Sequence, residues 1–107
     1  MNKDKALQML GMAQRAGAVK SGEFMTETSI KDGSAFLVIV ASDASENTRK
    51  QFRNSCDYYN VPFRIYSDKA GLGHCIGKEF RASLAVVNEG LAIKILDLLD
   101  GQKTDPQ

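Results

Sequence analysis

The chain is poor in metal-binding side chains. Its 107 residues include two cysteines and one histidine. Zinc sites built from Cys and His use four ligands, so these three residues are too few to complete one. Cys56 and Cys75 form no Cys-x-x-Cys pair, and Cys56 falls on the apolar face of an expected helix. We therefore predict no metal site and no cofactor, and we expect Cys56 in the core.

An excess of charge and a long apolar run are also absent. The net charge is +1, which gives no overall nucleic-acid signal, although basic residues can gather on one face without changing the total. No apolar run approaches the roughly 20 residues that a membrane span needs. Residues 1–5 lead into an amphipathic helix and not into an apolar signal core. We expect a cytoplasmic protein with one domain over 1–101 and a short tail over 102–107.

Apolar spacing predicts helices and short strands in alternation. The second helix is predicted to open with Ser21 as its cap, and the last to begin after Asn88 and to stop at Gly101. This order predicts an α/β fold, a three-layer α/β/α sandwich with a small sheet. Helices are expected over 4–16, 21–32, 46–59, 68–76 and 89–101, and strands over 35–41, 63–66 and 83–87.

Residues 37–48 have the pattern of a strand, a turn and a helix start. The apolar run Leu37-Val38-Ile39-Val40 is typical of a strand buried on both faces. Ser45 is a suitable cap for the next helix, and Glu46 favours its first turn. Because ligands of α/β sheets bind beyond the carboxyl ends of the strands, the turn Ala41–Ser45 is predicted to lie at a functional edge.

Motifs for catalysis are weak. The glycines of Gly71-Leu72-Gly73-His74-Cys75-Ile76-Gly77 make a poor dinucleotide fingerprint, because the first two fall inside an expected helix and the third is one residue late. His74 has no ligand or triad partner nearby in the sequence and is expected at the surface. We expect a non-catalytic protein, and a small nucleotide-using enzyme is the least favoured hypothesis.

Three strings resemble one family when taken in order. They are the string over residues 10–23 (LGMAQRAGAVKSGE), the turn over 38–45 (VIVASDAS) and the string over 72–78 (LGHCIGK). Together they resemble the kink-turn-binding ribosomal protein superfamily of the large subunit (the L-seven-Ae and L-thirty-e type), in its bacterial YlxQ-like branch. The resemblance covers roughly residues 4 to 100. It implies a four-stranded mixed sheet between helices.

The resemblance also implies an RNA-binding edge built from three segments: the start of the second helix, the loop after the long strand, and the loop after the short fourth helix. Kink-turn-binding members open the second helix with Gly-x-Asn-Glu-x-x-Lys, whose polar side chains read sheared G·A pairs. This chain keeps Gly22 but has Phe24, Met25 and Thr28 in place of Asn, Glu and Lys. Phe24 and Met25 cannot make amide or carboxylate contacts to base edges.

Several of these residues have more than one expected role, either in RNA binding or in the fold alone. Gly22 is expected to approach phosphate, or to form a simple capped turn. Phe24 is expected to stack on an unpaired base or, slightly favoured, to pack in the core. Asp43 is expected to orient a loop, accept from a base amine or cap its turn. Lys78 and Arg81 are the best phosphate candidates, unless their loop is only solvated surface. The predicted RNA-binding residues are Lys20, Ser21, Gly22, Glu23, Phe24, Thr28, Ser42, Asp43, Gly77, Lys78 and Arg81.

Two functions follow as hypotheses. The first is a non-catalytic protein that binds structured RNA, ribosomal or other non-coding, kink-turns among them, with the ribosome or translation proteins as further partners. The second is a protein-interaction module that kept the fold and lost kink-turn recognition. In that case Phe24 and Met25 would form an apolar patch at the former RNA edge.

Overall fold

The computed structural model describes residues 4–103 of the chain, with side chains to residue 101. Five helices and four strands alternate along this part. The helices are α1 (Lys5–Arg15), α2 (Glu23–Lys31), α3 (Glu46–Tyr59), α4 (Lys69–Cys75) and α5 (Glu89–Lys103), and the strands are β1 (Val19–Ser21), β2 (Leu37–Val40), β3 (Phe63–Ile65) and β4 (Ser83–Val86).

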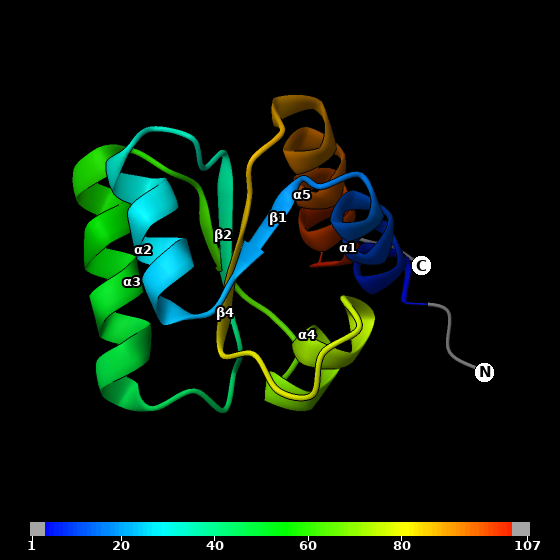
Figure 1. Cartoon of the computed structure of the whole chain (residues 1–107), viewed down its shortest axis with the longest axis horizontal. Coiled ribbons are helices and arrows are strands. Elements are labelled where there is room, and N and C mark those ends of the chain that lie inside the picture. The colour runs from blue at the N-terminus through cyan, green and yellow to red at the C-terminus, as the bar shows by residue number, and fades with distance from the viewer. Residues whose placement is uncertain (1–3, 104–107) are drawn as a thin grey trace.

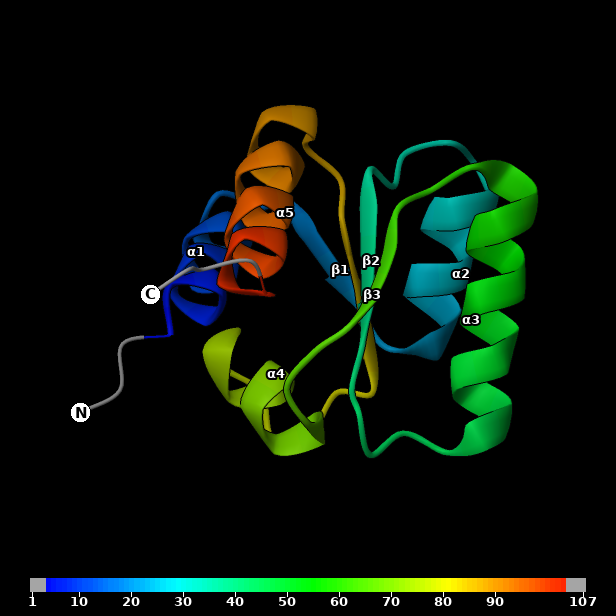
Figure 2. The same ribbon diagram turned by 180° about the vertical axis from the view of Figure 1, so that it is seen from behind.

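The strands form one sheet in the order β1-β4-β2-β3. β2 pairs with β3 in parallel and with β4 antiparallel, so the sheet is mixed. α2 and α3 cover one face, and α1, α4 and α5 cover the other (Figures 1 and 2). The predicted three-layer α/β/α sandwich with a four-stranded mixed sheet is confirmed.

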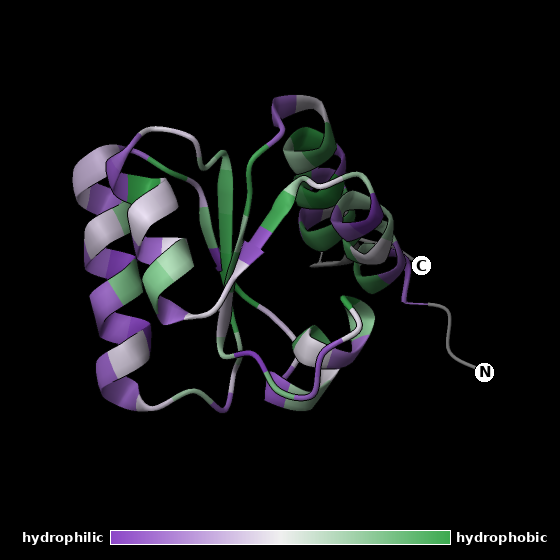
Figure 3. Cartoon of the chain, in the orientation of Figure 1, coloured by the Kyte–Doolittle hydropathy of each residue, from purple (hydrophilic) through white to green (hydrophobic). Residues whose placement is uncertain are grey.

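β2 is buried on both faces, as its apolar run predicted. Leu37 and Ile39 pack in the cluster beneath α1, α4 and α5, whereas Val38 and Val40 pack in the cluster beneath α2 and α3. All four side chains are fully buried. Successive strand side chains point to opposite faces, so one short run of β-branched and leucine residues supplies both cores. Figure 3 shows the apolar centre and the more polar outer surface of α3.

The resemblance implied four strands, but the sequence pattern placed only three of them. Val19–Ser21 forms β1 and pairs antiparallel with β4. Three residues are too few for a period-two pattern to show in the sequence. The prediction that Ser21 caps α2 is wrong, because Ser21 ends the strand and Gly22 occupies the cap position. Gly22 has φ 93°, a backbone conformation that suits glycine and strains other residues.

The remaining predicted helix starts are confirmed, and one predicted helix end is wrong. Ser45 accepts a hydrogen bond from the amide of Thr48 at 3.1 Å, and Asn88 accepts one from the amide of Leu91 at 2.9 Å. Gly101 does not stop α5, which continues to Lys103, so the tail predicted over 102–107 begins within a helix. Residues 104–107 lie outside the described part of the chain. None of the helices in residues 4–103 is long and apolar enough to cross a membrane.

Both cysteines are shielded. Cys56 is 1% exposed, which confirms its predicted core position, and Cys75 is partly buried. Burial, with a smaller contribution from Glu27, raises the pKa of Cys56 to about 12. Burial, with a smaller contribution from Asp4, raises the pKa of Cys75 to about 11. Both thiols therefore stay protonated as the pH rises from neutrality to about 10.

Thiol labelling tests this shielding. At pH 8 we expect about one thiol in a thousand or fewer to be ionised at either position, so iodoacetamide should modify the folded protein very slowly. Unfolding in urea should make both cysteines react at the rate of free cysteine. Mass spectrometry of labelled peptides checks the result. Fast modification of Cys56 in the folded protein would show that its side chain is accessible.

Candidate nucleic-acid interface

Three segments that are distant in sequence meet at one end of the sandwich. They are the end of β1 with the first turn of α2 (residues 20–25), the turn between β2 and α3 (residues 41–45), and the loop between α4 and β4 (residues 77–82). We call these residues together the lower edge, which lies at the bottom of Figure 1. Each segment lies beyond a strand or next to the start of one, where α/β sheets place their ligands.

Hydrogen bonds join the first and third segments directly. The guanidinium Nε of Arg81 donates to Ser21 Oγ at 3.1 Å, and its Nη1 donates to the carbonyl of Phe80 at 2.9 Å. The amide of Gly22 donates to the carbonyl of Ser83 at 3.0 Å. Arg81 therefore holds its own loop against the end of β1, next to the start of α2.

A buried hydroxyl pair lies behind this contact. Ser83 Oγ donates to Thr26 Oγ1 at 3.3 Å, and the two side chains are almost fully buried. Thr26 belongs to α2 and Ser83 to β4. Because a buried hydroxyl without a partner is costly, this pair favours one placement of α2 on the sheet.

The second segment is joined to the third through Lys69. Asp43 Oδ1 accepts from the amide of Lys69 at 2.9 Å, and the carbonyl of Lys69 accepts from the amide of Arg81 at 3.1 Å. Asp43 therefore orients the start of α4. Arg49 Nη1 donates to the carbonyl of Ser42 at 2.8 Å and holds the turn from the side of α3.

α4 and the loop 77–82 pack closely because Gly73 has no side chain. A Cβ atom built at Gly73 would lie 2.4 Å from the carbonyl oxygen of Glu79 and 2.8 Å from the amide nitrogen of Phe80. The amide of Lys78 also donates to the carbonyl of Gly73 at 2.8 Å. Gly77 turns the chain with φ 78°. The loop that carries Lys78 and Arg81 is thus fixed by backbone contacts.

The predicted site residues are mostly exposed. Phe24 is 77% exposed, so the slightly favoured expectation that it packs in the core is wrong. The reason is that α2 packs on the sheet through its opposite side, with Thr26, Ser29 and Ile30 buried. The exposed members of the predicted set are Lys20, Glu23, Phe24, Thr28, Ser42, Asp43, Gly77 and Lys78, and the partly buried members are Ser21, Gly22 and Arg81.

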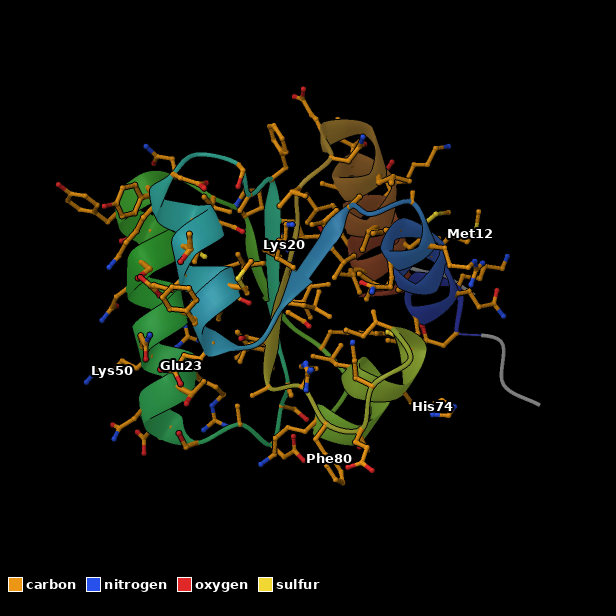
Figure 4. All side chains as sticks on the ribbon, in the orientation of Figure 1. Met12, Lys20, Glu23, Lys50, His74 and Phe80 are labelled. Carbon is orange, nitrogen blue, oxygen red and sulfur yellow. The ribbon has the colours of Figure 1, made fainter. Side chains whose placement is uncertain are left out.

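The structure brings most of these residues together, some by direct hydrogen bonds and others only through intervening residues. Ser21 and Gly22 contact the loop of Arg81 directly, whereas Ser42 and Asp43 are joined to it only through neighbours. Thr28 lies one helical turn beyond Phe24, away from the other segments. His74 is exposed, as predicted, and points away from the sheet in Figure 4.

The sequence analysis missed three residues that form or support the lower edge. Phe80, in the loop 77–82, is 62% exposed at the lower edge (Figure 4). The sequence does carry a signal for Phe80, because an aromatic residue between two charged residues in a loop is typical of an exposed binding residue. Lys69 acts through its backbone and Thr26 through a buried hydroxyl, and a single sequence gives no pattern for either.

Charges of both signs lie along the lower edge. The basic side chains of Lys20, Lys78 and Arg81 are accompanied by the exposed carboxylates of Glu23 and Glu79. No side chain of the described residues caps the first turn of α2, since Gly22 has none. Helix amides that lack protein partners favour an anion at this position. Among residues 4–101 no group of three or more His, Cys, Asp and Glu side chains is placed to hold a metal ion.

Comparison with known proteins identifies the family. The model of the ribosomal protein L7Ae/L30e/S12e/Gadd45 family matches residues 4–96. The chain belongs to this family, which confirms the resemblance found in the sequence.

Two relatives are named RNA-binding protein YlxQ. The protein from Bacillus subtilis is 44% identical over 86% of this chain and 92% of its own length. The protein from Enterococcus faecium is 40% identical over 94% of this chain and 96% of its own length. The large ribosomal subunit protein eL8 of Thermoplasma volcanium is 32% identical over 80% of this chain and 72% of its own length. The predicted YlxQ-like branch is confirmed.

Solved structures agree with the fold. A Bacillus halodurans protein of unknown function superposes with a TM-score of 0.89 and 33% identity, over 92% of this chain and 99% of that one. A Giardia lamblia 15.5 kD RNA-binding protein superposes with a TM-score of 0.79 over 97% of this chain and 92% of that one. The second is 18% identical and supports the fold alone.

Proposed function

We propose that this protein binds structured RNA, ribosomal or other non-coding, through the lower edge, as a binding protein and not as an enzyme. The observation that carries the proposal is the set of hydrogen bonds from Asp43 through Lys69 and Arg81 to Ser21, which makes one surface from three segments. Two relatives of 44% and 40% identity are named as RNA-binding proteins. Preformed surfaces of this kind bind without paying for loop ordering.

The start of α2 is the proposed phosphate contact. Gly22 leaves the first-turn amides uncovered, and the positive end of the helix dipole favours negative charge there. Lys20 precedes the helix in β1, and Arg81 reaches the same place through Ser21. Phosphate contacts of this type supply affinity without reading sequence. Lys78, one residue beyond the turn at Gly77, supplies a further charge at the edge.

Base recognition must then differ from that of relatives with Asn, Glu and Lys on α2. Phe24 and Met25 are exposed on the first turn, and neither side chain is a hydrogen-bond donor. A ring that is 77% exposed offers its face to an unpaired base. We propose that Phe24 stacks on a base of the bound RNA, and that shape and phosphate contacts give the remaining selectivity.

Substitution of Phe24 by alanine tests this contact. Stacking of a base on an aromatic ring is worth about 1–3 kcal/mol, so RNA affinity should fall by about fivefold to a hundredfold. The stability of the protein should change little, because the side chain is exposed. Tyr58→Ala is the matched control, since Tyr58 is 78% exposed at the far end of α3. Equal affinities of the two variants would exclude stacking by Phe24.

Binding to two RNAs tests the function itself. We would compare a kink-turn RNA with a straight duplex of the same composition, at about 50 mM and about 200 mM salt. A kink exposes unpaired bases and places phosphates of two stems close together, so we expect clear preference for the kink-turn. Similar, salt-sensitive affinities would indicate a different RNA held through phosphate. Absence of binding to both would contradict the proposal.

The exposure of Phe24 and Met25 also favours one other function. An aromatic residue and a methionine side by side are typical of protein interfaces. A module that binds a protein through these residues would retain its partners in cell extract after nuclease treatment. An RNA-binding protein would lose them. The nuclease step therefore separates the two functions in one pull-down.

A further inference from the structure

A groove runs from α1 past α4 to the loop 77–82. It is made of two adjoining hollows, one between α1 and α4 and one between α4 and the loop. Gly71 and His74 line both hollows, so the two adjoin at α4. In Figure 4 the labelled side chains of Met12, His74 and Phe80 mark its course along the side of the molecule. We call this feature the α1–α4 groove.

The elements that form the groove pack closely against one another. A Cβ atom at Gly11 of α1 would lie 2.9 Å from the carbonyl oxygen of Cys75, and one at Gly73 of α4 would lie 2.4 Å from that of Glu79. Such distances show that the backbones of α1, α4 and the loop lie in close contact. The groove is therefore a preformed surface, held in register with the lower edge.

Its walls carry basic and apolar side chains. Arg15 and Lys78 supply positive charge near its two ends, and Met12 and Phe80 are 52% and 62% exposed. One of its carboxylates is already engaged: Asp4 Oδ1 accepts from the amide of Leu7 at 3.0 Å and Oδ2 accepts from the hydroxyl of Tyr66 at 2.7 Å. Glu79 is the second acidic residue in the lining.

The groove is continuous with the lower edge, because Lys78 and Phe80 belong to both. The strands of an RNA bound at the lower edge must continue beyond it. The groove offers one path for such a strand, with apolar and basic side chains along it. Base-paired RNA hides its base faces inside the stack and cannot use apolar side chains. A single strand presents bases to Met12 and Phe80 and phosphates to Arg15 and Lys78.

We infer that the α1–α4 groove binds a single-stranded RNA segment that extends from the structured RNA held at the lower edge. This inference rests on the proposed function and names a second part of the same ligand. The groove adds one cation, Arg15, that the lower edge does not use. Each phosphate neutralised on a single strand steepens the dependence of log affinity on log salt by about 0.7.

The test uses a blunt-ended kink-turn RNA and two versions that carry about six unpaired nucleotides at the 5′ or the 3′ end. One overhang should raise the affinity of the wild-type protein about fivefold or more and steepen its salt dependence. Arg15→Glu should abolish this gain and leave binding of the blunt RNA unchanged. Lys94→Glu is the matched control, because Lys94 is exposed on α5 and lines neither hollow.

The outcomes separate the two claims. Binding of the blunt RNA without a gain from either overhang would overturn the groove and leave the proposed function standing, and the groove would then suit a protein partner. A gain that survives Arg15→Glu would place the overhang elsewhere and also overturn the inference. Failure of the blunt RNA to bind would overturn the proposed function. A 4-thiouridine in the overhang that crosslinks to α1 or α4 would support the groove directly, and crosslinks confined to other elements would contradict it.

Discussion

Replacement of Gly73 by alanine is expected to destabilise the fold and to weaken RNA binding at the same time. The added Cβ would lie 2.4 Å from Glu79 O and 2.7 Å from Glu79 C, both backbone atoms of the loop 77–82. A backbone neighbour cannot rotate away, so the loop must move. Insertion of a methyl group into a packed site costs about 1–3 kcal/mol. The moved loop carries Lys78 and Arg81, so affinity should fall by about tenfold or more.

Gly101→Ala is the control for this variant. Gly101 lies within α5, and a Cβ atom there would have no neighbour within 4 Å. Alanine in place of a helical glycine should therefore stabilise the protein slightly, by about 0.4–1 kcal/mol. Urea unfolding and RNA titration of both variants check the pair. A Gly73→Ala protein with wild-type stability and wild-type affinity would show that the loop tolerates displacement.

Replacement of Arg81 by alanine is expected to have the second large effect. The side chain holds Ser21 and the carbonyl of Phe80, and it adds positive charge next to the start of α2. Loss of the proposed charge-assisted hydrogen bond from Arg81 to an RNA phosphate should cost about 1.5–3 kcal/mol, which corresponds to about tenfold to a hundredfold in affinity. The slope of log affinity against log salt should decrease by about 1 for the lost phosphate contact.

Two further variants separate the charge of Arg81 from its geometry. Arg81→Lys keeps the charge but cannot reproduce the planar guanidinium contacts. Compared with Arg81→Ala, it should therefore restore the salt slope more fully than the affinity. Arg53→Ala removes a guanidinium that lies over the ring of Phe63, 5.4 Å from its centroid and outside the lower edge. It should leave both the affinity and the slope unchanged. An unchanged slope in Arg81→Ala would remove Arg81 from the phosphate contacts.

The parts of the fold that follow from the sequence are those with strong patterns. The run Leu37–Val40 predicted a doubly buried strand because each face of the sheet needs its own apolar side chains. Ser45 and Asn88 predicted helix starts because their side chains accept from amides that helices leave unpaired. These features depend on residues close together in the sequence, which a single sequence shows.

The features that escaped prediction depend on distant residues. β1 exists because three residues pair with β4, more than sixty positions later, and not because of a local pattern. Phe24 was expected to favour the core, yet Thr26, Ser29 and Ile30 provide the packing face of α2. Helical spacing alone places residues on a common face and does not say which face turns inward when the apolar signal is weak.

The candidate site likewise combines features that the sequence predicts with features that depend on distant residues. The three segments were named from the family resemblance, and the structure brings them together through Arg81, Lys69 and Asp43. Lys69 contributes only backbone atoms to this link, so its own residue type does not signal the role. The buried pair of Thr26 and Ser83 is a tertiary contact between ordinary hydroxyl residues. That individual side chains contact RNA stays a prediction, which rests on the sequence and on the exposure of the lower edge.

The most direct test is to map the RNA on the protein by NMR. Amide resonances of the ¹⁵N-labelled protein would be followed during titration with a kink-turn RNA. We expect the largest shifts in residues 20–25, 41–45 and 77–82, with the far ends of α3 and α5 little changed. Shifts concentrated at Phe36, Tyr58 and Ile93, which are exposed hydrophobic residues outside the lower edge, would contradict RNA binding at the lower edge.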